Sequence, residues 1–232
     1  MPNLKSNGGH ASAHRAWDRN WTDPAARGDW LDAAAEVQDI VPLLEDKGVR
    51  RVLDLGCGVG RHSLFLAGKG FDVTALDASQ SGLDFTRRAA EDAGFDLTCL
   101  QAQMTDLPLD DGSFDFVLSW NVIYHGDRAV VMRCLDEIAR ILRPGGLFQT
   151  TMLSKRHRLY RQGREVAADT FVIEDGDDHE KAHPHFYCDA RGLIDMIDPV
   201  FDVLRLSDGV AGDEPDATHL HLVAERRTGG RP

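Results

Sequence analysis

The sequence predicts an α/β fold in which helices cover both faces of a mostly parallel sheet. Short apolar runs alternate with amphipathic stretches through the middle of the chain, from Arg50 onward. Strands and helices that alternate in this way build a parallel sheet with right-handed crossovers. Two further observations support the prediction: a glycine-rich loop directly follows the first apolar run, and two β-type runs lie near the end of the chain, on either side of a turn-rich segment.

Length and composition agree with one globular domain. A chain of 232 residues, 42% of them hydrophobic, is long enough to bury a sizeable core. We expect residues 1–15 to form a flexible polar tail and residues 16–232 to form a single domain. The polar start is unlike a secretory signal, no apolar run is long enough to span a membrane, and the four scattered cysteines suit reduced thiols. These features predict a cytoplasmic protein without a membrane partner.

The formal net charge of −12 at pH 7 narrows the choice of partners. A negative field of this size repels polyanions, so the sequence predicts no nucleic-acid partner. A small molecule is the expected partner, and the composition leaves the oligomeric state open.

The predicted strands and helices in the middle of the chain follow from the spacing of apolar residues. The predicted strands cover residues 52–55, 71–76, 97–101, 114–119 and 146–153. The predicted helices cover residues 61–69, 81–93 and 128–142.

The two ends of the chain depart from this alternation. Residues 28–47 carry apolar side chains at helical spacing, which predicts one amphipathic helix leading into the sheet. Residues 154–188 are polar and rich in histidine, and such an insert after the fifth strand is typical of a lid, a binding loop or a disordered segment. A helix over residues 190–197 and an antiparallel hairpin of strands 201–206 and 219–224 complete the predicted fold.

The glycine-rich loop runs from Asp54 to Gly60, between a strand and a helix. Its glycines allow a sharp turn and let a ligand approach the backbone closely. The amides at the start of the next helix favour a carboxylate or a phosphate. The spacing differs from the dinucleotide fingerprint G-x-G-x-x-G, because position 61 is arginine. The loop alone is therefore compatible with several nucleotide cofactors.

Two acidic residues follow the loop, one at the end of the second predicted strand and one just past the third. Asp77 closes the second strand, where a carboxylate can accept both hydroxyls of a ribose. Asp106 lies just past the third strand, where it can accept an adenine amino group. Either residue alone can serve as a loop or cap residue. With the glycine loop they form three sites at successive strand ends, which meet at one crevice of a parallel sheet.

The stretches VLDLGCGVGRHSLFLAGKGFDVTALDAS, MTDLPLDDGSFDFVLSWNVIYH and RILRPGGLF resemble the class I S-adenosylmethionine-dependent methyltransferase superfamily. The resemblance covers residues 50–153 and is nearest to the small-molecule branch that includes ubiquinone/menaquinone-biosynthesis and tellurite-resistance-type enzymes. It implies a Rossmann-like, seven-stranded, mostly parallel sheet with an N-terminal helical lid. It also implies S-adenosyl-L-methionine as cofactor and S-adenosyl-L-homocysteine as product.

The resemblance implies roles for residues at the strand ends. The loop glycines pass the amino-acid portion of the cofactor, Asp77 holds the ribose, residues 103–106 frame the adenine, and Asn121 lies near the transferring methyl group. Cys57 is interpreted as a small packing residue and not as a nucleophile. The full set predicted to bind the cofactor is Trp21, Asp54, Gly56, Cys57, Gly58, Gly60, Asp77, Ala78, Gln103, Met104, Asp106 and Asn121.

The acceptor pocket is predicted where the fourth strand ends. Methyl transfer from a sulfonium requires alignment and desolvation of the acceptor, and a base only where the acceptor enters protonated with a high pKa. His125 is the candidate base and Tyr124 the second candidate catalytic residue, with Trp120 beside them as a substrate contact. The alternatives are a capping or supporting role for His125 and core packing for Tyr124. Of the N-terminal tryptophans, Trp21 lies in a polar setting and is the better lid candidate.

The histidines of the insert are the least usual feature of the sequence. His183, His185 and Tyr187 are predicted to contact the acceptor. His219 and His221 lie on one face of the last strand, because side chains two residues apart share a face. Two such histidine pairs can bind a metal if they meet, but their spacings match no strong zinc pattern, so no metal ligand is predicted. The acidic run 174–180 is predicted to be a solvated loop.

Three classes of function remain open at this point. The leading one is methyl transfer to a small molecule: a thiol, another chalcogen or metalloid nucleophile, or alternatively an oxygen or nitrogen of a metabolite. The second is a protein or nucleic-acid methyltransferase, against which stand the acidic charge and the absence of Asn-Pro-Pro-Tyr after the fourth strand. The third is a cofactor-binding module without catalysis.

Overall fold

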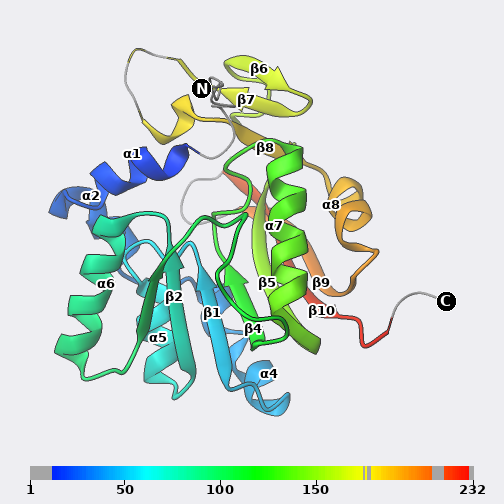
Figure 1. Ribbon diagram of the computed structural model, residues 1–232. Coiled ribbons are helices and arrows are strands. Elements are labelled where there is room, and N and C mark those ends of the chain that lie inside the picture. Colours follow the sequence, from blue (N-terminus) through cyan, green and yellow to red (C-terminus); the bar gives the residue numbers. More distant parts are fainter. Residues whose placement is uncertain (1–11, 175, 177–178, 211–216, 230–232) are drawn as a thin grey trace, which may run out of the picture.

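The computed structural model describes residues 12–174, 176, 179–210 and 217–229. Within these residues the strands form one sheet whose central part is parallel, in the order β3-β2-β1-β4-β5 (Figure 1). β10 pairs antiparallel with β5, and β9 pairs antiparallel with β10. These strands are β1 (Arg51–Leu55), β2 (Asp72–Asp77), β3 (Thr98–Gln101), β4 (Phe114–Ser119), β5 (Leu142–Ser154), β9 (Phe201–Val210) and β10 (Thr218–Arg226). The predicted α/β fold, with seven such strands and a C-terminal antiparallel hairpin, is confirmed.

The insert after the fifth strand adds three short strands to the predicted seven. β6 (Arg164–Ala167) and β7 (Thr170–Val172) form a hairpin, followed by a 3-10 turn, η2 (Glu180–Ala182). β8 (His185–Cys188) then joins the end of β5 in parallel, with Leu153 opposite Tyr187. Segments this short and polar carry no clear alternation, so the sequence pattern did not reveal them.

Four of the predicted helices are present, and side-chain caps explain where three of them begin. Asp127 accepts a hydrogen bond from the backbone N–H of Val130, and Asp189 accepts one from that of Gly192. Ser79 caps the helix after β2 through the N–H of Gly82. Such side chains satisfy amides that the first helical turn leaves unpaired. These helices are α5 (Arg61–Gly68), α6 (Gln80–Ala93), α7 (Arg128–Ile141) and α8 (Ala190–Ile197).

The prediction of one helix over residues 28–47 is wrong. The chain there forms a 3-10 turn, η1 (Gly28–Trp30), and two short helices, α3 (Ala35–Gln38) and α4 (Val41–Asp46). Proline has no N–H and fits only the first turn of a helix, and Pro42 lies in the first turn of α4. A helix must therefore begin near that residue, although the apolar spacing continues across it.

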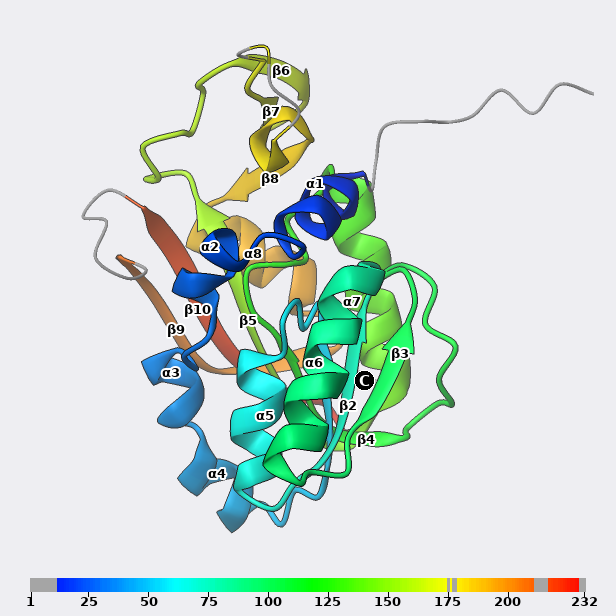
Figure 2. The ribbon, with the colours of Figure 1, turned by 90° about the vertical axis from the view of Figure 1, so that its left-hand side faces the viewer.

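The N-terminal segment begins earlier than predicted. Residues 1–11 of the expected flexible tail lie outside the described residues, and α1 (Ala13–Asn20) begins within that tail, followed by α2 (Pro24–Arg27). α1 and the insert lie at the same end of the molecule in both views (Figures 1 and 2). Among the described residues, no helix combines the length and the apolar character that crossing a membrane requires.

Alternate residues of the strands supply two hydrophobic cores, one on each face of the sheet. Leu53 and Val117 belong to the core that includes α7 and α8, while Val52 and Phe116 belong to the core that includes α3, α4 and α5. The prediction of helices on both faces is thereby confirmed.

The glycine loop connects β1 to α5 with left-handed backbone at its three glycines: Gly56 (φ +76°), Gly58 (φ +55°) and Gly60 (φ +80°). A Cβ atom at Gly60 would lie 2.5 Å from Cγ2 of Thr86 in α6. Glycine at this position therefore permits both the turn and the close packing of the loop against α6.

We predict that Gly60→Ala destabilises the protein more than Gly94→Ala. Both glycines have positive φ, +80° and +73°, so each alanine costs about 1 kcal/mol of backbone strain. At Gly94 nothing lies within 4 Å of the added Cβ, whereas at Gly60 the clash with Thr86 adds about 2 kcal/mol. Urea denaturation of the two variants measures the difference, and equal losses of unfolding free energy would contradict the prediction.

Candidate active site

A cavity of about 250 Å³ lies at the carboxyl ends of β1, β2 and β4. It is lined by the glycine loop, by residues after β2, β3 and β4, and by α1 and part of the insert. Predicted site residues in its wall are Trp21, Gly56, Cys57, Gly58, Asp77, Ala78, Gln103, Met104, Trp120, Asn121, Tyr124 and His125. Asp54, Gly60, Asp106, His183, His185 and Tyr187 are not among the residues that line it.

The carboxylate of Asp77 ties the glycine loop to the end of β2. Oδ2 accepts a hydrogen bond from the backbone N–H of Gly58 at 2.8 Å, and Oδ1 accepts one from that of Ser79 at 2.7 Å. Burial raises the pKa of Asp77, and these amides act in the opposite direction. Each carboxylate oxygen can accept a second hydrogen bond, so Asp77 retains capacity for hydroxyl groups in the cavity.

Asp54 lies beneath the loop and not in the cavity wall. Its side chain is 1% exposed, and Oδ2 accepts a hydrogen bond from the hydroxyl of Ser63 at 2.6 Å. Burial raises the pKa of this carboxyl from 3.8 to about 6, although the Ser63 hydroxyl and the positive charge of Arg61 act against the shift.

The turn after β3 separates the residues predicted to frame the adenine. Gln103 and Asp106 form an isolated β-bridge, and Gln103 and Met104 line the cavity. Asp106 is exposed on the outer side of the turn. The turn therefore brings two of these three residues to the cavity.

Asn121 has an unusual backbone conformation directly after β4. Its φ of +61° lies in the left-handed region, which costs a residue with a side chain about 1–3 kcal/mol. Thr151 of β5 holds this conformation: its hydroxyl accepts from the N–H of Asn121 at 2.7 Å and donates to Oδ1 of the same residue at 2.8 Å. The hydrogen bonds fix the direction of the Asn121 side chain at the edge of the cavity.

Three tryptophans of the N-terminal segment cover the glycine loop. Trp17 stacks on Trp21 with ring centroids 4.9 Å apart, and Trp30 meets both rings edge-on. Trp21 is 6% exposed, and a Cβ atom at Gly58 would lie 3.0 Å from its Cζ2. All three line the cavity, so sequence reasoning that favoured Trp21 alone missed the shared role of the group.

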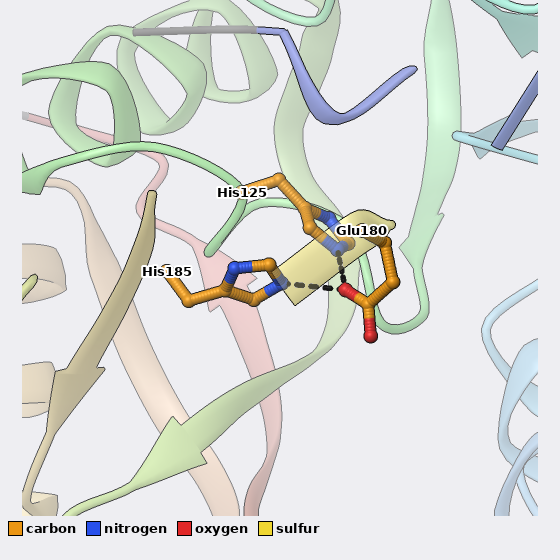
Figure 3. Close-up of side chains that lie close together, drawn as sticks. All are labelled: His125, Glu180 and His185. Carbon is orange, nitrogen blue, oxygen red and sulfur yellow. Dashed lines mark hydrogen bonds and ion pairs between the residues drawn. The ribbon is translucent and has the colours of Figure 1, made fainter. Parts of the chain in front are cut away.

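A group of polar side chains lies at the part of the cavity wall formed by His125 and Glu180. His125, Glu180 and His185 converge from the segment after β4, from η2 and from β8 (Figure 3). Oε2 of Glu180 lies 2.8 Å from Nε2 of His185 and 3.8 Å from Nε2 of His125. Burial opposes the ionisation of Glu180, but its contacts with both histidines and the charge of Lys181 outweigh burial and hold its pKa well below the usual range. The prediction that the whole run 174–180 is solvated is therefore wrong at Glu180.

Two residues predicted to contact the acceptor point elsewhere. Nδ1 of His183 lies 2.8 Å from the hydroxyl of Ser12 at the start of α1. Tyr187 belongs to the hydrophobic core, where its ring meets those of Tyr160 and Phe171. Tyr124 is buried in the same core but also reaches the cavity, and burial raises its pKa well above the ordinary value. Tyr124 is consequently a neutral hydroxyl at pH 7 and not a phenolate base.

Several cavity residues were not predicted from the sequence. The cavity is also lined by His14, Trp17, Trp30, Arg61, His62, Val122, His157, Glu180, Lys181 and His219. His219 had a usable signal, because the predicted shared face of His219 and His221 is confirmed by ring centroids 6.5 Å apart and by the burial of Leu220 and Leu222 in the core with α7 and α8. Most of the others lie on helices or turns, whose approach to the cavity depends on tertiary packing.

Comparisons with known proteins agree with this architecture. Residues 52–146 match the family model described as a methyltransferase domain. A demethylmenaquinone methyltransferase of Clavibacter sepedonicus is 39% identical over 135 residues, which cover 56% of this chain and 51% of that protein. The chain spans about half the length of the first curated relatives it matches.

Solved structures share the fold. The 1,6-didemethyltoxoflavin-N1-methyltransferase of Burkholderia thailandensis, with bound 1,6-didemethyltoxoflavin and S-adenosylhomocysteine, matches with a TM-score of 0.68 and 16% identity over 97% of this chain and 98% of that chain. A [4+2]-cyclase, SpnF, matches with a TM-score of 0.69 and 17% identity over 95% and 98%. At these identities the likeness carries the fold and not the reaction.

The methyltransferase-domain match and the curated relative agree with the glycine loop and with Asp77 at the end of β2. Residues 52–146 form a methyltransferase domain of the class I S-adenosylmethionine-dependent type. S-adenosylmethionine is the cofactor of this class, and the cavity lies where an open α/β sheet binds its ligand.

We predict that Asp54→Asn changes the pH dependence of stability in the protein without cofactor. The folded state holds the Asp54 proton more tightly than the unfolded chain, so its contribution to stability is greatest below pH 3.8 and is lost as pH rises towards about 6. The unfolding free energy of Asp54→Asn should therefore gain about 3 kcal/mol relative to the native chain between pH 3 and pH 7. Urea denaturation across this range measures the difference.

The matched control for this prediction is Asp72→Asn at the exposed start of β2. The stability difference from the native chain should change more with pH for Asp54→Asn than for Asp72→Asn. A difference for Asp54→Asn that stays constant between pH 3 and pH 7 would contradict the raised pKa of Asp54.

Proposed function

We propose that this protein transfers a methyl group from S-adenosylmethionine to a small-molecule acceptor bound in the cavity. The observation that carries the proposal is that one cavity is lined by the glycine loop, by Asp77 and by the segment after β4. S-adenosylmethionine supplies, when bound, a methyl group on a positively charged sulfur that an acceptor displaces in line.

The residues of the cavity fit this cofactor. The glycine loop exposes backbone with no side chain at Gly56 and Gly58, so a ligand can pass close to the chain. Asp77 has acceptor capacity left for ribose hydroxyls, and Gln103 and Met104 offer an amide and an apolar surface for a base. Asn121, held rigid by Thr151, is suited to orient the amino-acid portion near the reacting centre. Asp54 lies buried beneath the glycine loop, Gly60 packs the loop against α6, and the N–H of Asp106 donates a hydrogen bond to the carbonyl of Gln103.

The acceptor side of the cavity favours a small ligand. It is bounded by the tryptophans of the N-terminal segment and by polar groups of the insert, which we propose as a substrate-side cover over residues 154–188. Such a cover excludes water and cannot admit a polymer, and the net charge of −12 also disfavours nucleic acid. We propose a thiol or another chalcogen or metalloid nucleophile as acceptor, with an oxygen or nitrogen of a metabolite as the alternative.

His125 is the residue suited to receive a proton from an acceptor. Its Nδ1 lies 2.8 Å from the backbone carbonyl of Val122 and must donate to it, so Nε2 carries the lone pair of the neutral ring. His125 lines the cavity, as do Trp120 and Tyr124 of the same segment after β4. A soft nucleophile needs little help from this nitrogen, whereas a hydroxyl acceptor needs more.

We predict that calorimetry detects binding of S-adenosylmethionine and S-adenosylhomocysteine, and that Asp77→Asn weakens both at least about 10-fold through lost charge-assisted hydrogen bonds. Asp72→Asn, at the exposed start of the same strand, should leave both affinities unchanged. Binding of a nicotinamide dinucleotide in place of either compound would overturn the proposal.

The reaction itself needs a direct readout, because the fold is shared with a cyclase. We expect S-adenosylhomocysteine to form when the protein is incubated with S-adenosylmethionine and a panel of thiols, sulfide, selenite, tellurite, arsenite, phenols and amines. Cofactor binding without any product across this panel would favour a binding module over an enzyme.

A further inference from the structure

The cluster of His125, Glu180 and His185 has the composition of a metal site. Among the residues that the structure describes, these three are the group of histidine, cysteine or acidic side chains whose ligand atoms all lie within 4.8 Å of one another. They come from three separate segments, and both rings and the carboxylate point toward one place (Figure 3). Residues so far apart in sequence meet there only because the insert folds back over the end of β4.

The hydrogen bonds of both histidines fix which nitrogen carries the proton. Nδ1 of His125 lies 2.8 Å from the carbonyl of Val122, and Nδ1 of His185 lies 2.8 Å from the carbonyl of His183. A carbonyl oxygen only accepts, so each Nδ1 must be the donor. In the neutral ring, each Nε2 then presents a lone pair to Glu180. Metal-binding histidines show this arrangement, with one nitrogen bound to a carbonyl and the other free for the ion.

The ligand atoms of the cluster meet at a buried point. His185 is 1% exposed, and its Nε2 lies 2.8 Å from Oε2 of Glu180. Lys181 lies 3.1 Å from Oε1, the other oxygen of the same carboxylate. Oε2 is therefore the oxygen that faces both imidazoles, and one ion placed between these atoms could contact all three residues.

We propose that His125, Glu180 and His185 bind one divalent transition-metal ion of the Zn²⁺ type. Two imidazoles and one carboxylate suit zinc or a late transition metal better than Mg²⁺ or Ca²⁺, which prefer oxygen ligands. Ligands about 2.0–2.1 Å from a tetrahedral zinc lie about 3.4 Å apart. The observed separations of 2.8 Å and 3.8 Å lie on either side of that value.

The cluster borders the cavity through two of its three residues. Lys181 faces the outer oxygen of Glu180, and the rings of Tyr124 and Trp17 face His125 with centroids 4.7 Å and 6.5 Å away. His125 and Glu180 both line the cavity, so an ion held by the cluster can be reached from it. Three protein ligands and an accessible position are typical of a catalytic metal and not of a structural one.

A metal ion at this site would narrow the chemical class of the methyl acceptor. This step rests on the proposed function. An ion that takes Nε2 of His125 removes it as a free base, and an acceptor thiol or hydroxyl would then lose its proton on binding the ion. The proton leaves to solvent, and the acceptor enters the reaction as an anion. A metal-binding thiol or oxyanion is therefore the expected substrate class.

The proposal is tested by metal titration of the full chain without a histidine tag, stripped with a chelator and kept free of S-adenosylmethionine. Calorimetry should give one Zn²⁺ or Co²⁺ per chain and no measurable Mg²⁺ binding. The Co²⁺ protein should show the visible absorption of a four- or five-coordinate ion. Absence of Zn²⁺ and Co²⁺ binding would overturn the proposal.

Variants assign the site to these residues. Glu180→Gln and His185→Gln should each weaken Co²⁺ binding by at least about 10- to 100-fold. His219→Gln is the matched control, because His219 is also buried, also lines the cavity and also has Nδ1 bonded to a backbone carbonyl, that of Ala217. Unchanged Co²⁺ affinity in folded Glu180→Gln would contradict the proposal.

A measurement on the native chain tests the metal site even if a variant fails to fold. Nitrogen-15 NMR of the metal-free protein at pH 7 should show the Nε2 resonance of His185 shifting when Zn²⁺ is added. A His185 resonance that does not respond to Zn²⁺ would overturn the metal site. Because no step uses S-adenosylmethionine, loss of methyl transfer and loss of metal binding remain separate results.

Discussion

The hydrogen bonds that the Asp77 carboxylate accepts from the amides of Gly58 and Ser79 determine the geometry on which the site depends. They fix the left-handed glycine loop against the end of β2, and with it the start of α5. The same loop packs on α6 through Gly60 and supports Trp21 through Gly58. A carboxylate with further acceptor capacity thus connects the two strands that border the cavity and faces the ligand that would lie between them.

Two segments cover the cavity, α1 and the insert. Hydrogen bonds link α1 both to the frame, which is the parallel sheet with its glycine loop and helices, and to the insert. Asp18 of α1 accepts hydrogen bonds from the hydroxyl of Ser79 and the amide of Ser81, so α1 is fastened to the start of α6. Ser12 contacts His183, which joins the same helix to the insert. The two segments outside the repeating strand–helix pattern therefore meet above the cavity, and each limits the movement of the other. In the proposed function, these segments select the acceptor, because the frame beneath them would bind the cofactor.

The sequence was sufficient to predict the frame because its signals are local. Apolar alternation and the glycine spacing each act within a few residues, and they identified the parallel sheet, α5 to α8 and the position of Asp77, whereas Asn121 followed from the family resemblance. The prediction of one helix over residues 28–47 was wrong because Pro42 restricts where a helix can begin but leaves the apolar spacing unchanged. The prediction for Glu180 was wrong for another reason. Nothing in the neighbouring sequence of an acidic run indicates that tertiary packing will bring one of its residues between two histidines. Long-range contacts of this kind depend on the whole path of the insert.

The cluster shows how such an insert can supply chemistry that the frame lacks. Asp77 and Asn121 line the cavity, are held by backbone or hydroxyl groups, and are suited to binding. The groups of the insert differ, because the protons of both imidazoles are directed to carbonyls while their lone pairs face a carboxylate. Burying such an arrangement costs free energy unless a proton or a cation compensates it. A cation at the point where the three ligand atoms meet would satisfy all three groups at once, and His125 and Glu180 also line the cavity in which we propose that the acceptor binds.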